Sequence, residues 1–232
     1  MKLAQLLFTQ GFGTRRECAG LIAAEWVAIE GVVCSEPERE VEPLGLKFSV
    51  RGEPWTYHQR AFLVMNKPAG YECSQKPKHH PSVYALLPVP LRQRGVQAIG
   101  RLDEDTTGVL LFTDDGALIH RLTSPKHHVP KVYDVGCKHP VDASQVERLR
   151  QGVLLHEENE TVRAAACEAT GPGRLRLTLT EGKYHQVKRM LAAVGNHVLA
   201  LHRSDVGRLA LPHDLAPGDW RWVGRSAIAE GL

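Results

Sequence analysis

The chain has 232 residues, of which 43% are hydrophobic and 24% charged, as expected for an ordinary globular protein. It contains no run of about 18 apolar residues, which excludes a membrane-spanning helix. The N-terminus lacks the apolar core and cleavage site of a signal peptide. The five cysteines are scattered without a C-x-x-C pair, which argues against a disulfide framework or a structural zinc site. We therefore expect a cytoplasmic protein with free thiols.

The formal net charge is +3. The first 60 residues carry seven basic and eight acidic side chains, so the small excess of positive charge lies in the remainder of the chain. A weakly basic total permits a nucleic-acid partner but does not require one.

The first elements along the chain indicate a small separate domain. Residues 3–24 are predicted to be helical, with a break at Gly11–Gly13 and a capping box formed by Thr14 and Glu17. Residues 27–33 predict two short strands around a Glu-Gly turn, and a second short strand pair should end near Trp55. The acidic run at 35–43 predicts a solvated loop between them. We expect one domain over residues 1–58 and a larger one over 59–232.

The larger domain alternates strand-like runs with a few helices. Strands are predicted at FLVMN, VQAIG, VLLFT, KVYDV, LRLTLT and HVLALHR, and a short helix at GALIHRLTS that ends before Pro125. Residues 184–195 have apolar side chains at helical spacing, with Gly195 as the cap. The predicted fold is therefore α+β, with helices packed on a mixed, mostly antiparallel sheet.

The segment IGRLDEDTTGVLLFT places three consecutive acids between two apolar runs. Adjacent carboxylates repel each other and lose hydration near a core, so Asp103, Glu104 and Asp105 indicate a functional loop. Arg101 is close enough to compensate part of this charge, and Thr106 and Thr107 add hydroxyl groups. The alternatives are a solvated surface turn or a D-x-D metal site, for which no further ligand set is evident.

The segment EGKYHQVKRM opens the predicted helix at 184–195. Lys188 lies at the edge of its apolar stripe, so the ammonium group can reach a cleft and hold a carboxylate ionised. The simpler alternative is a lysine whose stem only covers the core. Arg189 and His185 should face solvent.

Two further segments carry basic groups. SPKHHVPKVYDV combines Lys126 and Lys131 with Tyr133, an aromatic residue able to stack on a nucleobase. MNKPAGY places Asn66 and Lys67 in a turn after a strand.

Together, VMNKPAGY, GRLDEDTTGVLLFTDDG, SPKHHVPKVYDV and EGKYHQVKRM resemble the pseudouridine synthase family, and specifically its ribosomal small subunit synthase A branch. Residues 1–58 resemble an S4-type RNA-binding domain through TRREC and the VAIEG turn, although KLAQLL replaces the usual start. The YHQVKRM motif is similar to the corresponding motif of the small-subunit branch. Large-subunit relatives tend to carry an asparagine-arginine-glutamine-isoleucine-arginine run instead.

The resemblance implies a role for each matched residue. Asp103 matches the catalytic aspartate that acts at the ribose, either as a nucleophile or as a base. Tyr133 matches the tyrosine that packs against the base, and Lys188 a basic position, often arginine, that pairs with the aspartate. Arg101 matches a residue that fills the space left by the flipped base. The other expected RNA contacts are Thr106, Thr107, Asn66, Lys67, Lys126, Lys131, Arg189, Arg15 and Arg16.

The implied reaction isomerises a uridine of 16S ribosomal RNA, of the uridine 516 type, to pseudouridine. Uracil leaves the ribose and reattaches through carbon without redox change, so no cofactor or metal is expected. The expected partner is 16S RNA or a small-subunit assembly particle, and the protein should act as a monomer away from membranes.

Three alternatives remain open at this point. The first is a pseudouridine synthase that acts on large-subunit ribosomal RNA. The second is a metal-dependent glycosyl or phosphoryl transferase that uses Asp103 and Asp105, whose activity would be lost in a chelator. The third is a noncatalytic RNA-binding assembly factor, which would tolerate Asp103→Asn.

Overall fold

The computed structural model describes residues 1–155 and 161–229. These divide into two compact units, each considered below by itself. Unit 1 comprises Met1–Ala61, Leu87–Gln97 and Thr113–Asp115, and unit 2 comprises Phe62–Leu86, Ala98–Phe112 and Gly116–Leu232.

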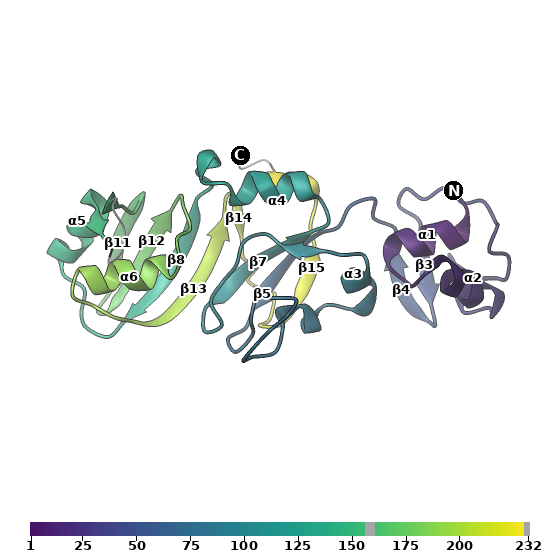
Figure 1. Cartoon of the computed structure of the whole chain (residues 1–232), viewed down its shortest axis with the longest axis horizontal. Helices are drawn as coiled ribbons and strands as arrows, with labels where there is room; N and C mark the ends of the chain where they lie inside the picture. Colours follow the sequence, from purple (N-terminus) through teal and green to yellow (C-terminus); the bar gives the residue numbers. More distant parts are fainter. Residues whose placement is uncertain (156–160, 230–232) are drawn as a thin grey trace. The chain divides into compact units, whose positions relative to one another are not determined.

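Unit 1 packs two helices on a small sheet (Figure 1). The helices α1 (Leu3–Gln10) and α2 (Arg15–Ala23) are separated at Gly11, which has a left-handed φ of 86° and caps α1. Thr14 and Glu17 form the predicted capping box. The antiparallel sheet has the order β2-β1-β3-β4, formed by β1 (Val27–Ile29), β2 (Val32–Cys34), β3 (Lys47–Val50) and β4 (Glu53–Thr56). The short helix α3 (Val89–Gln93) also belongs to this unit.

Unit 2 is built on a nine-stranded mixed sheet, whose main path has the order β11-β12-β8-β13-β7-β5-β15. The strands on this path are β5 (Phe62–Lys67), β7 (Thr107–Thr113), β8 (Lys131–Cys137), β11 (Ala166–Gly171), β12 (Arg174–Leu179), β13 (Val198–Val206) and β15 (Trp220–Trp222). Off the path, β6 (Gln97–Ala98) pairs with β7 and β14 (Leu209–Ala210) with β13, while β9 (Val153–Leu154) and β10 (Thr161–Val162) form a separate ladder. The β13–β7 pair is parallel, and β13 pairs antiparallel with β8.

Helices cover this sheet at two places (Figure 1). The helices α5 (Ala143–Gln151) and α6 (Gln186–Ala193) contribute to a core with β8 and β12, through Leu149, Met190 and Leu191 among others. The helix α4 (Gly116–Thr123) packs Leu118 and Leu122 into a second core. The remaining helices are η1 (Val83–Leu86), η2 (Pro125–His127) and α7 (Arg225–Ala229).

The α+β class and the mixed, mostly antiparallel sheet are confirmed. Several element bounds differ from those expected. The VQAIG run forms only the two-residue strand β6, and α6 begins at Gln186 because His185 has a left-handed φ of 47°. The alternating LRLTLT run does form a half-buried strand, with Leu175, Leu177 and Leu179 inward.

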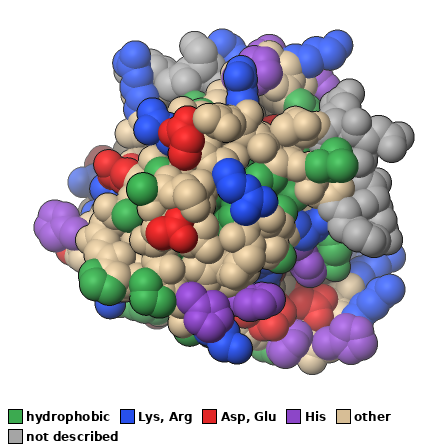
Figure 2. All heavy atoms as spheres, turned by 90° about the vertical axis from the view of Figure 1, so that its left-hand side faces the viewer, with side chains coloured by type: hydrophobic (Ala, Val, Ile, Leu, Met, Phe, Trp, Pro, Cys, Tyr) green, Lys and Arg blue, Asp and Glu red, His purple; other side chains and the backbone are tan. Residues whose placement is uncertain are grey.

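Within the described ranges, we find no helix that is long and apolar enough to cross a membrane. The visible end face of the molecule, which carries α5 and β11, shows basic, acidic and histidine side chains interspersed over a mostly uncharged surface (Figure 2). Among the described residues of this face, the basic side chains are scattered and do not form one continuous patch.

Candidate active site

A cavity of about 860 Å³ opens in unit 2, and every residue that lines it belongs to that unit. Its lining includes Lys131 and Tyr133 of β8 and Leu201 and Arg203 of β13. Residues two apart on a strand face the same side of a sheet, and Arg203 lies directly opposite Tyr133 in the antiparallel register. One face of two neighbouring strands therefore supplies part of the cavity wall.

The loop between β6 and β7 supplies another part, from Ile99 to Thr106. Thr106 N–H donates to the carbonyl oxygen of Asp103 over 3.2 Å, which closes a turn around the acidic residues. Beneath it, the fully buried ammonium of Lys67 donates to the carbonyl oxygens of Pro68, Glu104 and Thr106 at 3.0, 3.0 and 2.9 Å. Because one cation binds three carbonyl groups, the backbone of the acidic loop is fixed from below.

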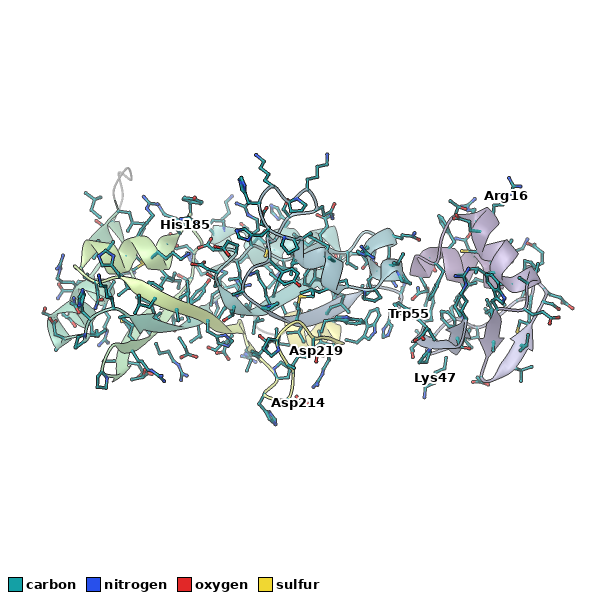
Figure 3. The ribbon with its side chains drawn as sticks, turned by 90° about the horizontal axis from the view of Figure 1, so that it is seen from below. Arg16, Lys47, Trp55, His185, Asp214 and Asp219 are labelled. Carbon is teal, nitrogen blue, oxygen red and sulfur yellow. The ribbon has the colours of Figure 1, made fainter. Side chains whose placement is uncertain are left out.

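The α6 helix brings Lys188 to this loop. Lys188 Nζ lies 3.1 Å from Asp103 Oδ2, and it also donates to both oxygens of Asp105 at 2.7 and 2.9 Å. On the other side, His185 Nε2 lies 3.4 Å from Asp103 Oδ1. Figure 3 shows His185 at the end of α6 nearest the middle of unit 2. Each oxygen of Asp103 thus has its own nitrogen neighbour, and the Asp103 side chain is 30% exposed.

The charges in this cluster support one another. Burial opposes the charge on Lys188, but its hydrogen bonds to Asp105 and Asp103 outweigh that cost and raise the lysine pKa above its ordinary value. Burial likewise disfavours ionised Asp105, yet the hydrogen bonds from Lys188 leave the pKa of that carboxyl below its ordinary value. Asp105 and Lys188 are therefore both charged at neutral pH.

Another part of the cavity wall combines an aromatic ring with one nearly buried cation, Arg203, and one half-buried cation, Lys131. Tyr133 is 9% exposed and Arg203 is 3% exposed. Arg203 Nε donates to the carbonyl oxygen of Val109 over 2.8 Å, whereas its Nη2 has no hydrogen-bond partner within the described part of the chain. Burial, with a smaller contribution from the charge of Arg203, lowers the pKa of Lys131. This wall is apolar enough for a flat base and retains hydrogen-bond donors for its carbonyl groups.

Asp103, Lys188 and Tyr133 all line this one cavity. The model of a family described as RNA pseudouridylate synthase matches residues 61–193, which is more than half of the chain. The chain belongs to the RNA pseudouridylate synthase family. It is a pseudouridine synthase, an enzyme that isomerises uridine in RNA.

Three curated relatives of this pseudouridine synthase match between 74% and 99% of its length. It is 39% identical over 235 residues to the ribosomal small subunit pseudouridine synthase A of Yersinia pestis, covering 99% of this chain and 97% of the relative. It is 46% identical over 172 residues to the protein of the same name in Escherichia coli K12, covering 74% of each chain. An uncharacterized RNA pseudouridine synthase of Bacillus subtilis is 40% identical, over 95% of this chain and 94% of the relative.

Solved structures agree on the fold. A crystal structure described as a pseudouridylate synthase superposes over 100% of both chains, with a TM-score of 0.71 and 33% sequence identity. A chain from an H/ACA ribonucleoprotein bound to a substrate RNA superposes with a TM-score of 0.50 over 68% of this chain and 50% of that chain. At 18% identity, the second likeness shows the fold alone.

Several residues expected at an RNA interface are placed where RNA can reach them. Arg101 is exposed on the cavity lining, and Lys126 is exposed after α4. Arg15 and Arg16 are exposed on α2, and Figure 3 shows Arg16 projecting outward from that helix. Arg189 is half-buried and donates to the carbonyl oxygen of Tyr184 over 3.3 Å. For all of these, RNA binding stays a prediction.

Tertiary packing encloses the side chains of the other expected contacts, and their binding to RNA also stays a prediction. Lys67 is fully buried, and its ammonium group donates to three carbonyl oxygens, two of them in the acidic loop. Asn66 is 8% exposed and donates to Leu215 O over 2.8 Å. The Thr107 hydroxyl lies 2.8 Å from His202 Nδ1 within the sheet. Thr106 lines the cavity but is only 1% exposed.

Neither His185, which was expected to face solvent, nor Arg203 was predicted to be part of the site. His185 turns toward Asp103 because its backbone is left-handed, a conformation that a helical wheel cannot represent. Arg203 could have been found only from the strand register that places it beside Tyr133. Lys188 was expected to pair with Asp103, and it also binds Asp105, which was not predicted.

Among residues 1–155 and 161–229, no three histidine, cysteine, aspartate or glutamate side chains are grouped so that they could hold a metal ion.

Proposed function

We propose that this pseudouridine synthase modifies a uridine of small-subunit 16S ribosomal RNA, of the uridine 516 type. The relatives of Escherichia coli and Yersinia pestis that carry the small-subunit name support this substrate, as does the EGKYHQVKRM motif. The alternative substrate is a uridine of large-subunit ribosomal RNA. The substrate can be the RNA itself or a partly assembled small-subunit particle in the cytoplasm.

The observation that carries the proposed mechanism is the ion pair of Asp103 and Lys188 inside a cavity that Tyr133 also lines. Asp103 acts at the ribose of the target uridine, and Lys188 keeps its carboxylate charged and oriented. The uridine must leave its stack to enter, which costs a few kcal/mol. Arg101, at the cavity lining, is placed to fill the space that the base vacates.

Once the glycosidic bond breaks, the detached uracil must turn and present a ring carbon to the ribose. We propose that Tyr133 packs against the ring during this step, while Arg203 and Lys131 stand ready to donate to its carbonyl oxygens. A donor in a nearly dry wall stabilises negative charge on those oxygens more strongly than water does. Because the reaction exchanges one ribose–base bond for another without redox change, it requires no cofactor.

Binding of the rest of the RNA is assigned to residues outside the cavity. We propose that residues 1–58 form an S4-like RNA-binding domain, which contacts phosphates through Arg15 and Arg16, and that 59–232 form the catalytic domain. Lys126 and Arg189 add contacts near the cavity. The enzyme acts as a monomer in this scheme.

The direct test is to map pseudouridine along the ribosomal RNAs of cells that lack this protein. We expect one pseudouridine of 16S RNA to disappear and to return when the gene is restored. Loss of a pseudouridine from the large-subunit RNA instead would favour the alternative substrate. An unchanged map of both RNAs would contradict the proposal.

A further inference from the structure

Beside the cavity, two aromatic side chains are stacked in a way that catalysis by Asp103 and Lys188 does not itself require. The rings of Tyr184 and His185 have centroids 3.8 Å apart and an interplanar angle of 22°. Both residues line the cavity that holds Asp103. Tyr184 is 73% exposed, more than the other large aromatic side chains exposed in the described ranges, Phe8 at 39% and Trp26 at 49%. The outer face of a ring pair is thus open to solvent at the active site.

The pair is held in place by its surroundings. Arg189 donates to the carbonyl oxygen of Tyr184, which ties that residue back to α6. The preceding loop is fixed by buried Gln186, whose side chain accepts from Lys183 N–H and donates to Glu181, both over 2.8 Å. A side chain that keeps 73% of its surface in water within so constrained a loop is preorganised to receive a partner.

The inner member of the pair contacts the reacting carboxylate. His185 has a left-handed φ of 47°, which is unfavourable for a residue with a Cβ atom. This conformation places Nε2 3.4 Å from Asp103 Oδ1, while Lys188 lies near Oδ2. Strained backbone of this kind persists where the surrounding structure enforces it, and it is concentrated at functional sites.

We propose that Tyr184 is a stacking platform for an unpaired nucleobase of the substrate RNA next to the target uridine, and that His185 is a positioning residue that transmits this contact to Asp103. The proposal rests on the proposed function, because it requires an RNA whose target base is swung out. A flat base is the fitting ligand for an exposed ring, and aromatic stacking accepts any of the four bases. The neighbouring nucleotide then stacks on Tyr184, whose ring in turn stacks on the His185 ring that approaches the carboxylate through Nε2.

The platform is tested with Tyr184→Leu and its matched control Tyr184→Phe in the full chain. The substrate is 16S RNA, naked or in small-subunit particles, from cells that lack the protein. We expect Tyr184→Leu to raise KM roughly 10-fold, equal to about 1.4 kcal/mol, with kcat within about twofold. Tyr184→Phe should behave like the wild type, since it keeps the ring. An unchanged KM for Tyr184→Leu would overturn the platform.

The positioning role is tested with His185→Asn and His185→Gln. Asparagine tolerates the left-handed backbone but is too short to reach Asp103, whereas the amide of glutamine extends about as far as the imidazole. We expect His185→Asn to lower kcat roughly 10-fold at an unchanged melting temperature, and His185→Gln to restore most of it. Equal kcat in all three forms, or a loss that follows the melting temperature, would refute this role.

These outcomes are separable from a failure of the proposed function. If the wild-type enzyme forms no pseudouridine in 16S RNA, then the substrate assignment is wrong, and the same variants are measured on large-subunit RNA from those cells. If the wild-type enzyme is active and the variants behave like it, only the platform and the positioning role are wrong.

Discussion

At the residue scale, the active site is a small network in which one ammonium group serves two carboxylates. Lys188 binds Asp105 through two short hydrogen bonds and lies 3.1 Å from Asp103. The lysine is therefore anchored by Asp105 and shared with Asp103. This division suits a catalytic carboxylate, because the cation lies near one oxygen of Asp103 while its two shortest hydrogen bonds go to Asp105.

Removal of the ammonium group should impair the reaction more than it impairs folding. We expect Lys188→Ala to lower kcat at least about 100-fold, because both carboxylates then lose their cation. Lys188→Arg keeps the charge, so its loss should stay within roughly 10-fold. Single-turnover rates on 16S RNA at saturating enzyme measure this directly, and comparable rates for Lys188→Ala and the wild type would argue against the ion pair.

Asp105 should affect how activity depends on pH. The Lys188 pKa is raised above its ordinary value despite burial, so its ammonium persists until the pH passes that raised value. In Asp105→Asn the strongest hydrogen-bonding partner loses its charge, and the lysine pKa falls. We expect the alkaline limb of the kcat profile to move to lower pH in this variant. If the alkaline limb lies at the same pH in the wild type and in Asp105→Asn, then deprotonation of Lys188 does not cause that limb.

Some of this network followed from the sequence and some did not. The edge position of Lys188 on a predicted helix, together with the family resemblance, led to the pairing with Asp103. The burial of Lys67 was not predicted, because its sequence neighbours, a strand and a Pro-Ala-Gly turn, do not reveal that the acidic loop folds over it. His185 was missed because a single left-handed residue redirects its side chain.

At the element scale, the site depends on how closely β7 and β13 approach each other. Gly108 of β7 pairs in parallel with Arg203 of β13 and has a φ of 102°. A Cβ atom at this position would lie 2.2 Å from the backbone oxygen of Arg203. The glycine therefore permits both the conformation and the contact that bring the acidic loop beside the wall of Tyr133 and Arg203.

We expect Gly108→Ala to destabilise the protein by about 3 kcal/mol, through backbone strain and a clash that no side-chain rotation can relieve. Gly116→Ala is the matched control, since an added Cβ there meets nothing within 4 Å and the residue begins α4. The control should change the free energy of unfolding by less than about 1 kcal/mol in denaturant titrations. Equal effects of the two substitutions would contradict this reading of the β7–β13 pair.

The elements themselves were predictable where local signals were strong. The capping box of α2, the Glu-Gly turn between β1 and β2, and the alternation in β12 were all found. The strand order was not, because pairing of β13 with both β8 and β7 joins segments far apart in the chain. Long-range pairing is decided by how complete faces pack, which periodicity within one segment does not specify.

At the scale of the whole molecule, we expect catalysis and RNA binding to be separable. The proposed chemistry lies in unit 2, whereas Arg15 and Arg16 are exposed on α2 in unit 1. The double variant Arg15→Glu, Arg16→Glu should bind RNA more weakly with an unchanged single-turnover kcat. The slope of log affinity against log salt should fall by about two, one unit for each lost phosphate contact.

Arg150→Glu is the control for this charge change, because Arg150 is exposed on α5 and is not among the cavity residues. Its salt dependence should match that of the wild type. Should the double variant and the control share the wild-type slope, the proposal that α2 contacts phosphates would be abandoned.

The most direct test of the whole account is pseudouridine formation by Asp103→Asn. Asparagine has nearly the same size as aspartate and keeps one oxygen, so the variant should fold and bind RNA like the wild type while losing the charge that acts at the ribose. We expect cells that carry only this variant to show no pseudouridine at the target uridine, and the purified variant to form none. Pseudouridine at that position in such cells would contradict the assignment of Asp103.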